Sequence, residues 1–139
     1  MNSIRLLLIT LFIVSCGGNP ERDVDQLEIL RNVVAEHDFK FIDLQDDQIL
    51  LYSSKDDWRA HQNAVLVNDP RASHGMFLDV NIEYISRIGH NIDFVVGSWI
   101  DDRVGYIWSP DGKISTDGLG TVKKIRSAWY QYDTFYPSR

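Results

Sequence analysis

The segment that most constrains the fold of this chain is residues 91–109, with the sequence NIDFVVGSWIDDRVGYIWS. Two runs rich in β-branched and aromatic residues flank the polar residues 101–103, a pattern that predicts a β-hairpin. No other segment after residue 15 is as apolar, so we expect the hairpin to lie near the centre of a sheet. The segment constrains the fold far more than it constrains the chemistry.

The length of the loop decides which side chains of the hairpin share a face. A two-residue loop formed by Asp101 and Asp102 would set Gly97 opposite Tyr106, where the large ring would cover the bare backbone. In that register the other opposing pairs are Trp99 with Val104 and Val95 with Trp108. Because side chains alternate along a strand, a three-residue loop would give a different arrangement. It would place Val104, Tyr106 and Trp108 on the face of Ile92, Phe94, Val96 and Ile100.

The N-terminus has the features of an export signal. Arg5 provides a positive charge, and residues 6–14 form an apolar core of nine residues. A helix needs about 20 residues to cross the hydrocarbon core of a bilayer, so this segment is too short for a permanent span. We therefore expect residues 1–15 to be a signal peptide that is removed on export.

The end of this signal, Ile13-Val14-Ser15-Cys16, resembles the lipobox of bacterial lipoproteins. The resemblance implies that Cys16 is linked to diacylglycerol, is acylated with a fatty acid such as palmitate, and becomes the mature N-terminus. Two or three acyl chains would anchor the protein permanently. Gly17 differs from the Asp that retains lipoproteins of enteric bacteria in the inner membrane, so the resemblance implies the periplasmic face of the outer membrane. The alternative is an ordinary secretory signal that happens to contain a cysteine.

Removal of residues 1–15 leaves 124 of the 139 residues, enough for one domain with a core and too few for two. We expect residues 16–19 to be a short tether and residues 20–139 to form a single globular domain. The loss of Arg5 changes the formal net charge from −6 to −7, which argues against nucleic acid as a partner. Cys16 is the only cysteine, so its acylation would leave no thiol for a disulfide.

The periodicity of the remaining sequence predicts one helix followed by several strands. Asn19 can cap a helix and Pro20 suits its first position, with acidic residues next at the positive end of the helix dipole. Apolar residues then recur at three- and four-residue steps to about His37. In addition to the hairpin, strands are expected at residues 39–44, 48–53, 63–68, 76–80 and 125–132.

The sequence of residues 81–89 fits two structures. Alternate apolar residues from Val80 to Tyr84 suit a strand, whereas isoleucines at every third position suit a helix, which Gly89 would end. We expect a short helix near residues 81–88. The sequence thus predicts an α+β fold, in which an N-terminal helix packs on a mostly antiparallel sheet of about six strands.

The C-terminal part resembles the endings of small bacterial proteins to which no activity is assigned. Those proteins carry a Gly-aromatic-x-aromatic-Ser-Pro turn and a terminal Trp-Tyr-x-Tyr strand, which this chain has at residues 105–110 and 129–132. The resemblance covers less than a third of the chain and implies neither an activity nor a cofactor.

Residue types that often carry chemistry are present, but they form no recognisable motif. The four histidines are scattered and match no zinc spacing. The acidic pairs at residues 46–47 and 101–102 suit hairpin turns, where aspartate is common for backbone reasons. Ser98 follows Gly97 outside the G-x-S-x-G pattern of hydrolases. The sequence therefore predicts no catalytic residue, no metal site and no cofactor.

Aromatic residues gather near the C-terminus. They follow a basic cluster in an otherwise acidic chain, and exposed rings can stack on sugars or grip a partner protein. The candidate binding residues are Lys123, Lys124, Arg126, Tyr130, Tyr132, Phe135 and Tyr136. The alternative is that most of the aromatic rings pack between the helix and the sheet as cross-strand pairs.

These features favour a non-catalytic lipoprotein of the cell envelope, which binds an envelope protein or glycan through its C-terminal edge. An alternative in the same class is an immunity or inhibitor protein against a periplasmic toxin or hydrolase, since an acidic surface attracts basic enzymes. An alternative in another class is a hydrolase with an unrecognised site. A toxin gene adjacent in the genome would favour the immunity protein. Convergence of His and Asp in one pocket would favour the hydrolase.

Overall fold

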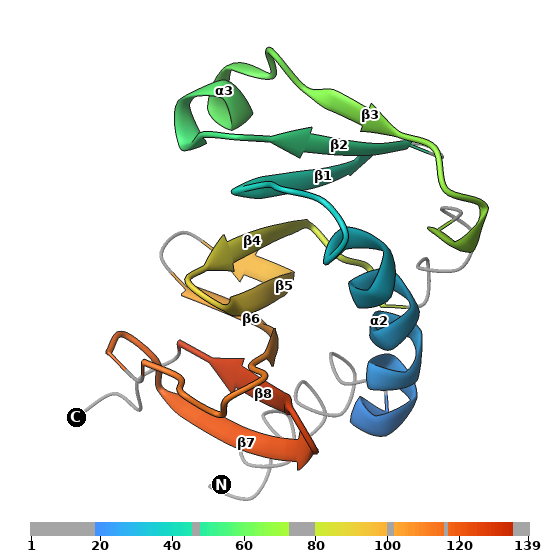
Figure 1. Ribbon diagram of the computed structural model, residues 1–139. Coiled ribbons are helices and arrows are strands. Elements are labelled where there is room, and N and C mark those ends of the chain that lie inside the picture. Colours follow the sequence, from blue (N-terminus) through green and yellow to red (C-terminus); the bar gives the residue numbers. More distant parts are fainter. Residues whose placement is uncertain (1–18, 46–47, 73–79, 100–101, 116, 135–139) are drawn as a thin grey trace, which may run out of the picture.

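The computed structural model describes residues 19–45, 48–72, 80–99, 102–115 and 117–134. Within these ranges the chain has the expected α+β fold, with one long helix, one short helix and eight antiparallel strands in one sheet, in the order β3-β2-β1-β4-β5-β6-β8-β7 (Figure 1). The helices are α2 (Pro20–Val34) and α3 (Lys55–Ala60), with a short 3-10 turn η1 (Pro70–Ala72). The strands are β1 (Phe41–Gln45), β2 (Gln48–Tyr52), β3 (Val65–Val67), β4 (Tyr84–Ile88), β5 (Asn91–Trp99), β6 (Asp102–Trp108), β7 (Thr121–Arg126) and β8 (Trp129–Asp133).

Helix α2 begins as the sequence predicts and ends earlier. The Asn19 side chain accepts a hydrogen bond from the Glu21 backbone N–H at 3.1 Å, and Pro20 occupies the first turn. The helix ends at Val34, three residues before the expected end at His37. Its buried residues are Val24, Leu27, Leu30, Val33 and Val34. This apolar stripe faces the sheet, so we name the face under α2 the near face and the opposite face the far face.

The hydrophobic core lies between α2 and the near face of the sheet. Alternate residues of successive strands point toward the helix, as the period of a strand requires. Trp129 on β8 is fully buried, and its ring lies 5.3 Å from that of Phe94 on β5. Trp108 on β6 is half-buried, and the guanidinium of Arg31 on α2 lies over its ring, 4.7 Å from the ring centre. The near face is therefore sealed by apolar packing and closed at its margin by helix side chains.

The hairpin of β5 and β6 is central, as expected, but its register contains a β-bulge. Trp99 lies opposite Asp102, and the pairing shifts between Val95 and Gly97. Gly97 consequently lies opposite Val104, so the expected pairing of Gly97 with Tyr106 is wrong. Tyr106 and Trp108 instead share the near face with Phe94 and Ile92, which is the arrangement of the second alternative. A three-residue loop was expected to cause this arrangement. The bulge causes it instead, by adding one residue to β5.

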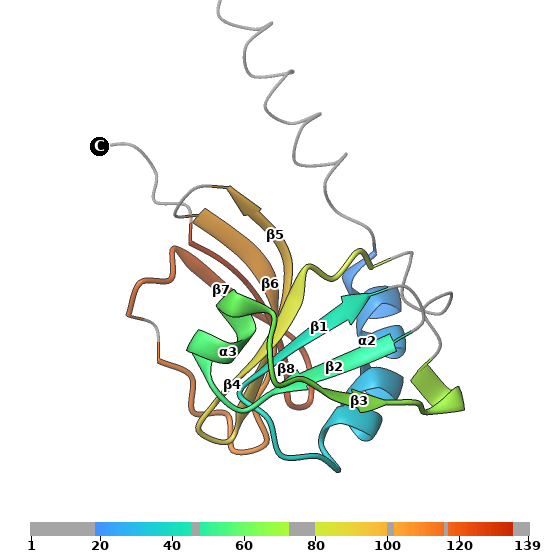
Figure 2. The ribbon, with the colours of Figure 1, turned by 90° about the horizontal axis from the view of Figure 1, so that it is seen from above.

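The short helix expected near residues 81–88 is wrong, because Tyr84–Ile88 forms strand β4. This strand pairs with β1 on one side and with β5 on the other, so backbone pairing outweighs the three-residue repeat of isoleucines. The second helix is α3, which lies in the connection that contains Trp58. Ser54 caps it through a 3.1 Å hydrogen bond from the Asp57 N–H. Figure 2 shows α2 and α3 on opposite sides of the sheet.

The C-terminal segment forms two strands where one was expected. Strands β7 and β8 make a hairpin around Ser127, whose φ of 37° is in the left-handed region. Two expected features, the strand at residues 76–80 and the turn at residues 46–47, lie wholly or almost wholly outside the described residues. Within the part of the chain that the structure describes, no helix has the length and apolarity needed to cross a bilayer.

Candidate functional site

The far face of the sheet carries a polar pair in which both residues are buried, Asp93 and Tyr132. Asp93 on β5 and Tyr132 on β8 are each 2% exposed. Strand β6 lies between β5 and β8, so the two side chains meet across an intervening strand. The Tyr132 hydroxyl donates a hydrogen bond of 2.7 Å to the Oδ1 atom of Asp93. A buried polar group needs such a partner, because leaving it unpaired costs about 1–3 kcal/mol.

Gly105 on β6 makes this contact across the strand possible. It lies opposite Tyr132 on one side and Val95 on the other. A Cβ atom at this position would lie 2.3 Å from the backbone oxygen of Phe94 and 3.0 Å from the Tyr132 hydroxyl. The tyrosine ring therefore passes over the bare backbone of Gly105 to reach Asp93. The covered glycine that the sequence suggested at Gly97 occurs instead at Gly105.

Burial raises the pKa of Asp93 to about 6, from an ordinary value of 3.8. The hydrogen bond from Tyr132 and the positive charge of Arg103 act in the opposite direction and only partly offset the burial. The pKa of Tyr132 is raised as well, first by burial and then by the adjacent carboxylate. Asp93 thus changes its charge near the lower end of the physiological pH range.

Arg103 on β6 lies above this pair. Its guanidinium carbon is 5.9 Å from the centre of the Tyr132 ring, and the side chain of Tyr84 on β4 also lies near it. No carboxylate among the described residues lies within the 4.0 Å of an ion pair with this guanidinium. Arg103 is half-buried, so its charge is held partly away from water without an opposite charge in direct contact.

A pocket opens on the far face above these residues, between the sheet and the loop that joins β6 to β7. Its volume is about 390 Å³, within the range of roughly 300–1,000 Å³ that is usual for ligand sites. Besides Asp93, Arg103 and Tyr132, the residues that line it include Ile88, Asn91, Ile107, Lys113, Ile114, Asp117 and Leu119. The Asn91 side chain holds the loop in place by donating a 2.9 Å hydrogen bond to the Lys113 carbonyl.

The lining combines charges of both signs with aliphatic side chains. Arg103 and Lys113 supply positive charge, Asp117 supplies an exposed negative charge, and Ile107 and Leu119 supply apolar surface. Asp93 and Tyr132 form the floor, where each is only 2% exposed. The arrangement suits recognition of a small ligand with a carboxylate better than it suits proton transfer.

The structure divides the seven candidate binding residues among different places. Tyr132 is buried in the pocket floor and is not part of an exposed edge. Lys124 and Tyr130 lie opposite each other on β7 and β8, with the lysine ammonium 6.0 Å from the ring centre. Tyr130 faces the pocket loop, since its hydroxyl would be 3.2 Å from a Cβ at Gly112. These two residues therefore lie on the far face, next to the pocket.

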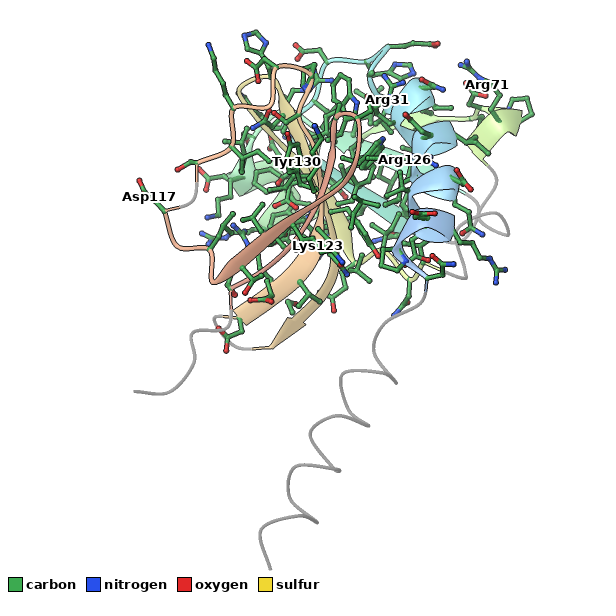
Figure 3. The ribbon with its side chains drawn as sticks, turned by 90° about the horizontal axis from the view of Figure 1, so that it is seen from below. Arg31, Arg71, Asp117, Lys123, Arg126 and Tyr130 are labelled. Atoms are coloured by element: carbon green, nitrogen blue, oxygen red, sulfur yellow. The ribbon has the colours of Figure 1, made fainter. Side chains whose placement is uncertain are left out.

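Arg126 and Lys123 belong to the other side of the same hairpin. The Nη1 atom of Arg126 forms a 2.6 Å ion pair with the Oδ1 atom of Asp25 on α2. Lys123 is exposed and lies opposite Gln131. Figure 3 shows Arg126 beside α2, with Asp117 on the opposite side of the hairpin. The remaining candidates Phe135 and Tyr136 lie outside the described residues, as does Cys16.

Of the residues that line the pocket, only Tyr132 was predicted from the sequence, and the four charged ones, Asp93, Arg103, Lys113 and Asp117, were not. Only Asp93 carried a signal, because it is a lone acid within the most apolar strand. Arg103 was assigned to a polar turn, but it lies opposite Ser98 inside the hairpin. Lys113 lies in a loop, and only the folded loop brings it over the sheet.

A second cluster on the far face attaches α3 to the sheet. The ring of Trp58 stacks on Phe41 at 4.5 Å, and its Nε1 donates a 2.7 Å hydrogen bond to the Oδ1 atom of Asp43. The Nδ1 atom of His61 is 3.7 Å from the other oxygen of Asp43. No group of three or more potential metal ligands occurs among the residues with described positions. We interpret this cluster as structural.

No protein-family model, no curated protein and no solved structure matches this chain. The functional interpretation therefore depends on the geometry of the far-face pocket and on the sequence of the N-terminus.

Proposed function

We propose that this protein is a non-catalytic binding protein of the bacterial cell envelope, anchored through lipid on Cys16, and that the far-face pocket holds its ligand. The observation that supports the pocket as the binding site is the environment of Arg103. Its guanidinium lines a cavity of about 390 Å³ with no described carboxylate in ion-pair contact. A ligand carboxylate would supply the missing charge.

The physical reason is the cost of a half-buried charge that has no carboxylate in ion-pair contact among the described residues. A guanidinium presents parallel N–H donors that match the two oxygens of a carboxylate, and such charge-assisted pairs are about twice as strong as neutral hydrogen bonds. The ring of Tyr132 lies under the guanidinium, with 5.9 Å between the guanidinium carbon and the ring centre. Arg103 is therefore held in place before a ligand arrives, which reduces the entropy lost on binding.

The remaining lining defines the ligand class. Asp117 would attract an amine, while Ile107 and Leu119 would contact aliphatic groups. Peptides with free carboxylates, an amine and small aliphatic side chains carry all three features. The stem peptides of peptidoglycan have this chemistry and are present in the envelope, so they are the ligands we propose.

The proposed anchor would keep the pocket near the membrane. Asn19, which caps α2, is only three residues beyond Cys16 in the sequence. Three residues span at most about 11 Å, so α2 would begin directly at the lipid surface. We expect the wild-type chain to partition into detergent and to incorporate labelled fatty acid, and Cys16→Ser to do neither. Unchanged labelling of Cys16→Ser would contradict the lipid anchor without affecting the pocket.

The pocket is tested by titrating the full chain, in mild detergent, with a soluble muramyl pentapeptide in a calorimeter. We expect Arg103→Met to raise the dissociation constant at least tenfold, which corresponds to a loss of about 1.4 kcal/mol of binding free energy. The matched control Lys123→Met removes the same charge from an exposed position outside the pocket and is expected to change binding less than twofold. Equal effects of the two variants, or no binding by wild type, would contradict the proposal.

The immunity or inhibitor role and the hydrolase role stay predictions from the sequence. An inhibitor would capture a protein from envelope extract, and this capture would survive Arg103→Met. A hydrolase would release product from the same muramyl peptide. Neither outcome is expected from a pocket that binds a small peptide above a sealed floor.

A further inference from the structure

The sheet ends in two edge strands, and one of them presents apolar side chains to solvent. Among the residues that the structure describes, strand β3 pairs only with β2 and forms one end of the strand order, as Figure 1 shows. Val65 is 63% exposed and Leu66 is 46% exposed. Only two other large hydrophobic residues among those described are exposed, Ile29 and Ile88, and neither is adjacent to another. Because neighbouring side chains of a strand point to opposite faces, the edge strand β3 exposes one apolar side chain on each face of the sheet.

The opposite edge strand, β7, has a different composition. Lys123 and Lys124 in its middle are both exposed. Lysines on an edge strand prevent it from pairing with other strands, because the charges would have to be desolvated. Residues 62–68, which contain β3, include no charged side chain. One edge is therefore protected against strand pairing, and the other is open to it.

We propose that β3 pairs with β3 of a second copy of this chain, in antiparallel orientation and centred on Leu66. In that register Leu66 of one copy lies opposite Leu66 of the other on the far face. Val65 of each copy lies opposite Val67 of the other on the near face. Leu66 is thereby covered by Leu66 of the other copy and Val65 by Val67 of the other copy, and the two sheets become continuous.

The charge around β3 favours a second copy as the occupant. The chain as a whole has a net charge of −6, so two copies repel each other over most orientations. The flanking region 55–72 is neutral, with three basic residues, Lys55, Arg59 and Arg71, and three acidic residues, Asp56, Asp57 and Asp69. This region can meet an identical region without repulsion. A strongly basic or acidic protein partner would gain no electrostatic attraction from this neutral region.

The expected dimer is weak, because each copy contributes a strand of only three residues. Interfaces below about 1,200 Å² in total are usually transient. The inference is independent of the proposed ligand site, since two strands, β2 and β1, separate β3 from β4, which is the first strand of the sheet that lines the pocket.

The test is cross-linking of single cysteines in the full chain, solubilised in mild detergent. Cys16 is the only native cysteine, so all variants carry Cys16→Ser. With a short bifunctional maleimide, Leu66→Cys is expected to form a covalent dimer. Ile29→Cys, at an exposed position on α2, is expected to yield less than a fifth as much, and so is Lys123→Cys on β7. In the Leu66→Cys chain, adding Val65→Lys should reduce the dimer at least fivefold, whereas Ile29→Lys should change it less than twofold.

Melting temperatures show whether each variant keeps the fold. We expect that they all do, because the substituted positions are exposed. Dimer formation that follows this order supports pairing through β3. Absence of cross-linking by Leu66→Cys, equal cross-linking by Ile29→Cys or Lys123→Cys, or a dimer that Val65→Lys leaves unchanged would each overturn the proposal.

Discussion

Tyr106 and Tyr132 lie on opposite faces of the sheet, and each donates a 2.7 Å hydrogen bond to an aspartate. On the near face Tyr106 reaches Asp23 at the half-buried margin of α2. On the far face Tyr132 reaches Asp93, which is 2% exposed. The first bond fastens a helix over an apolar core, and the second satisfies a carboxyl group buried beneath a pocket.

This difference separates the two ways in which the sheet is stabilised. The near face depends on apolar volume, so removal of large side chains should have the greatest effect there. The far face depends on a polar pair and on the glycine between its members, so small changes of shape or charge should matter more. It is also the face on which a charged residue, Arg103, is left without a described ion pair.

The largest effect is expected at the centre of the near face. Trp129 is fully buried, so Trp129→Ala should lower the free energy of unfolding by about 3–5 kcal/mol. Trp108→Ala should cost about 1–3 kcal/mol, because its ring is only half-buried. Chemical denaturation of both variants provides the comparison. A larger loss from Trp108→Ala would place the centre of the core under β6 and not under β8.

On the far face, Gly105→Ala should lower the free energy of unfolding by about 3 kcal/mol, because its methyl group would overlap the backbone oxygen of Phe94. The control is Gly97→Ala, where the nearest atom is a flexible methyl of Val104 at 3.2 Å. That substitution should cost about 1 kcal/mol or less. Similar costs for the two glycines, measured by thermal denaturation, would contradict a ring that passes over Gly105.

The charge of Asp93 should make the far face sensitive to pH. Because its pKa is raised from 3.8 to about 6, the folded state keeps a proton that the unfolded state releases in this interval. The contribution of Asp93 to stability is therefore complete below pH 3.8 and is lost as the pH rises through 6. Asp93→Asn removes this loss, because asparagine does not titrate. The free energy of unfolding of this variant minus that of wild type should therefore increase by about 2–3 kcal/mol between pH 4 and pH 7. A difference that does not change with pH would show that Asp93 titrates normally.

The smallest effects come from removing one hydroxyl on each face. Tyr132→Phe should cost about 2 kcal/mol at pH 7, since it leaves a buried carboxylate without its donor. Tyr106→Phe should cost about 1 kcal/mol, because water can replace the hydroxyl at the half-buried Asp23. Urea denaturation at pH 7 measures both. The reverse order would mean that the far-face pair is accessible to water.

The sequence predicted the near face better than the far face, and the physical reason is locality. The stripe on α2 and the alternation in β5 are periodic, so they indicate a buried face without knowledge of the neighbouring strands. Residues 84–88 have two periods, and only their pairing with β1 and β5 decides between them. Ser127 turns the β7–β8 hairpin with a positive φ but without the Gly or Asn that would have indicated it.

Helix α3 could have been found from the sequence. Ser54 and Asp57 have the spacing of a capping box, and the Ser54 hydroxyl also donates to the Asp57 carboxylate at 2.9 Å. The pocket could not have been found in this way. Asp93, Arg103 and Tyr132 come from three strands, and only the order β5-β6-β8 together with Gly105 brings them into contact. Residues that are brought together in this way have no characteristic spacing in the sequence.

The most direct test of the far-face site is an NMR titration of the Asp93 carboxyl carbon, with and without a muramyl pentapeptide. In the free protein we expect a pKa of about 6. A ligand carboxylate on Arg103 would place a second negative charge nearby, so the bound protein should show a higher pKa for Asp93. A pKa near the ordinary 3.8, or one that the peptide leaves unchanged at saturation, would contradict a ligand site above Asp93.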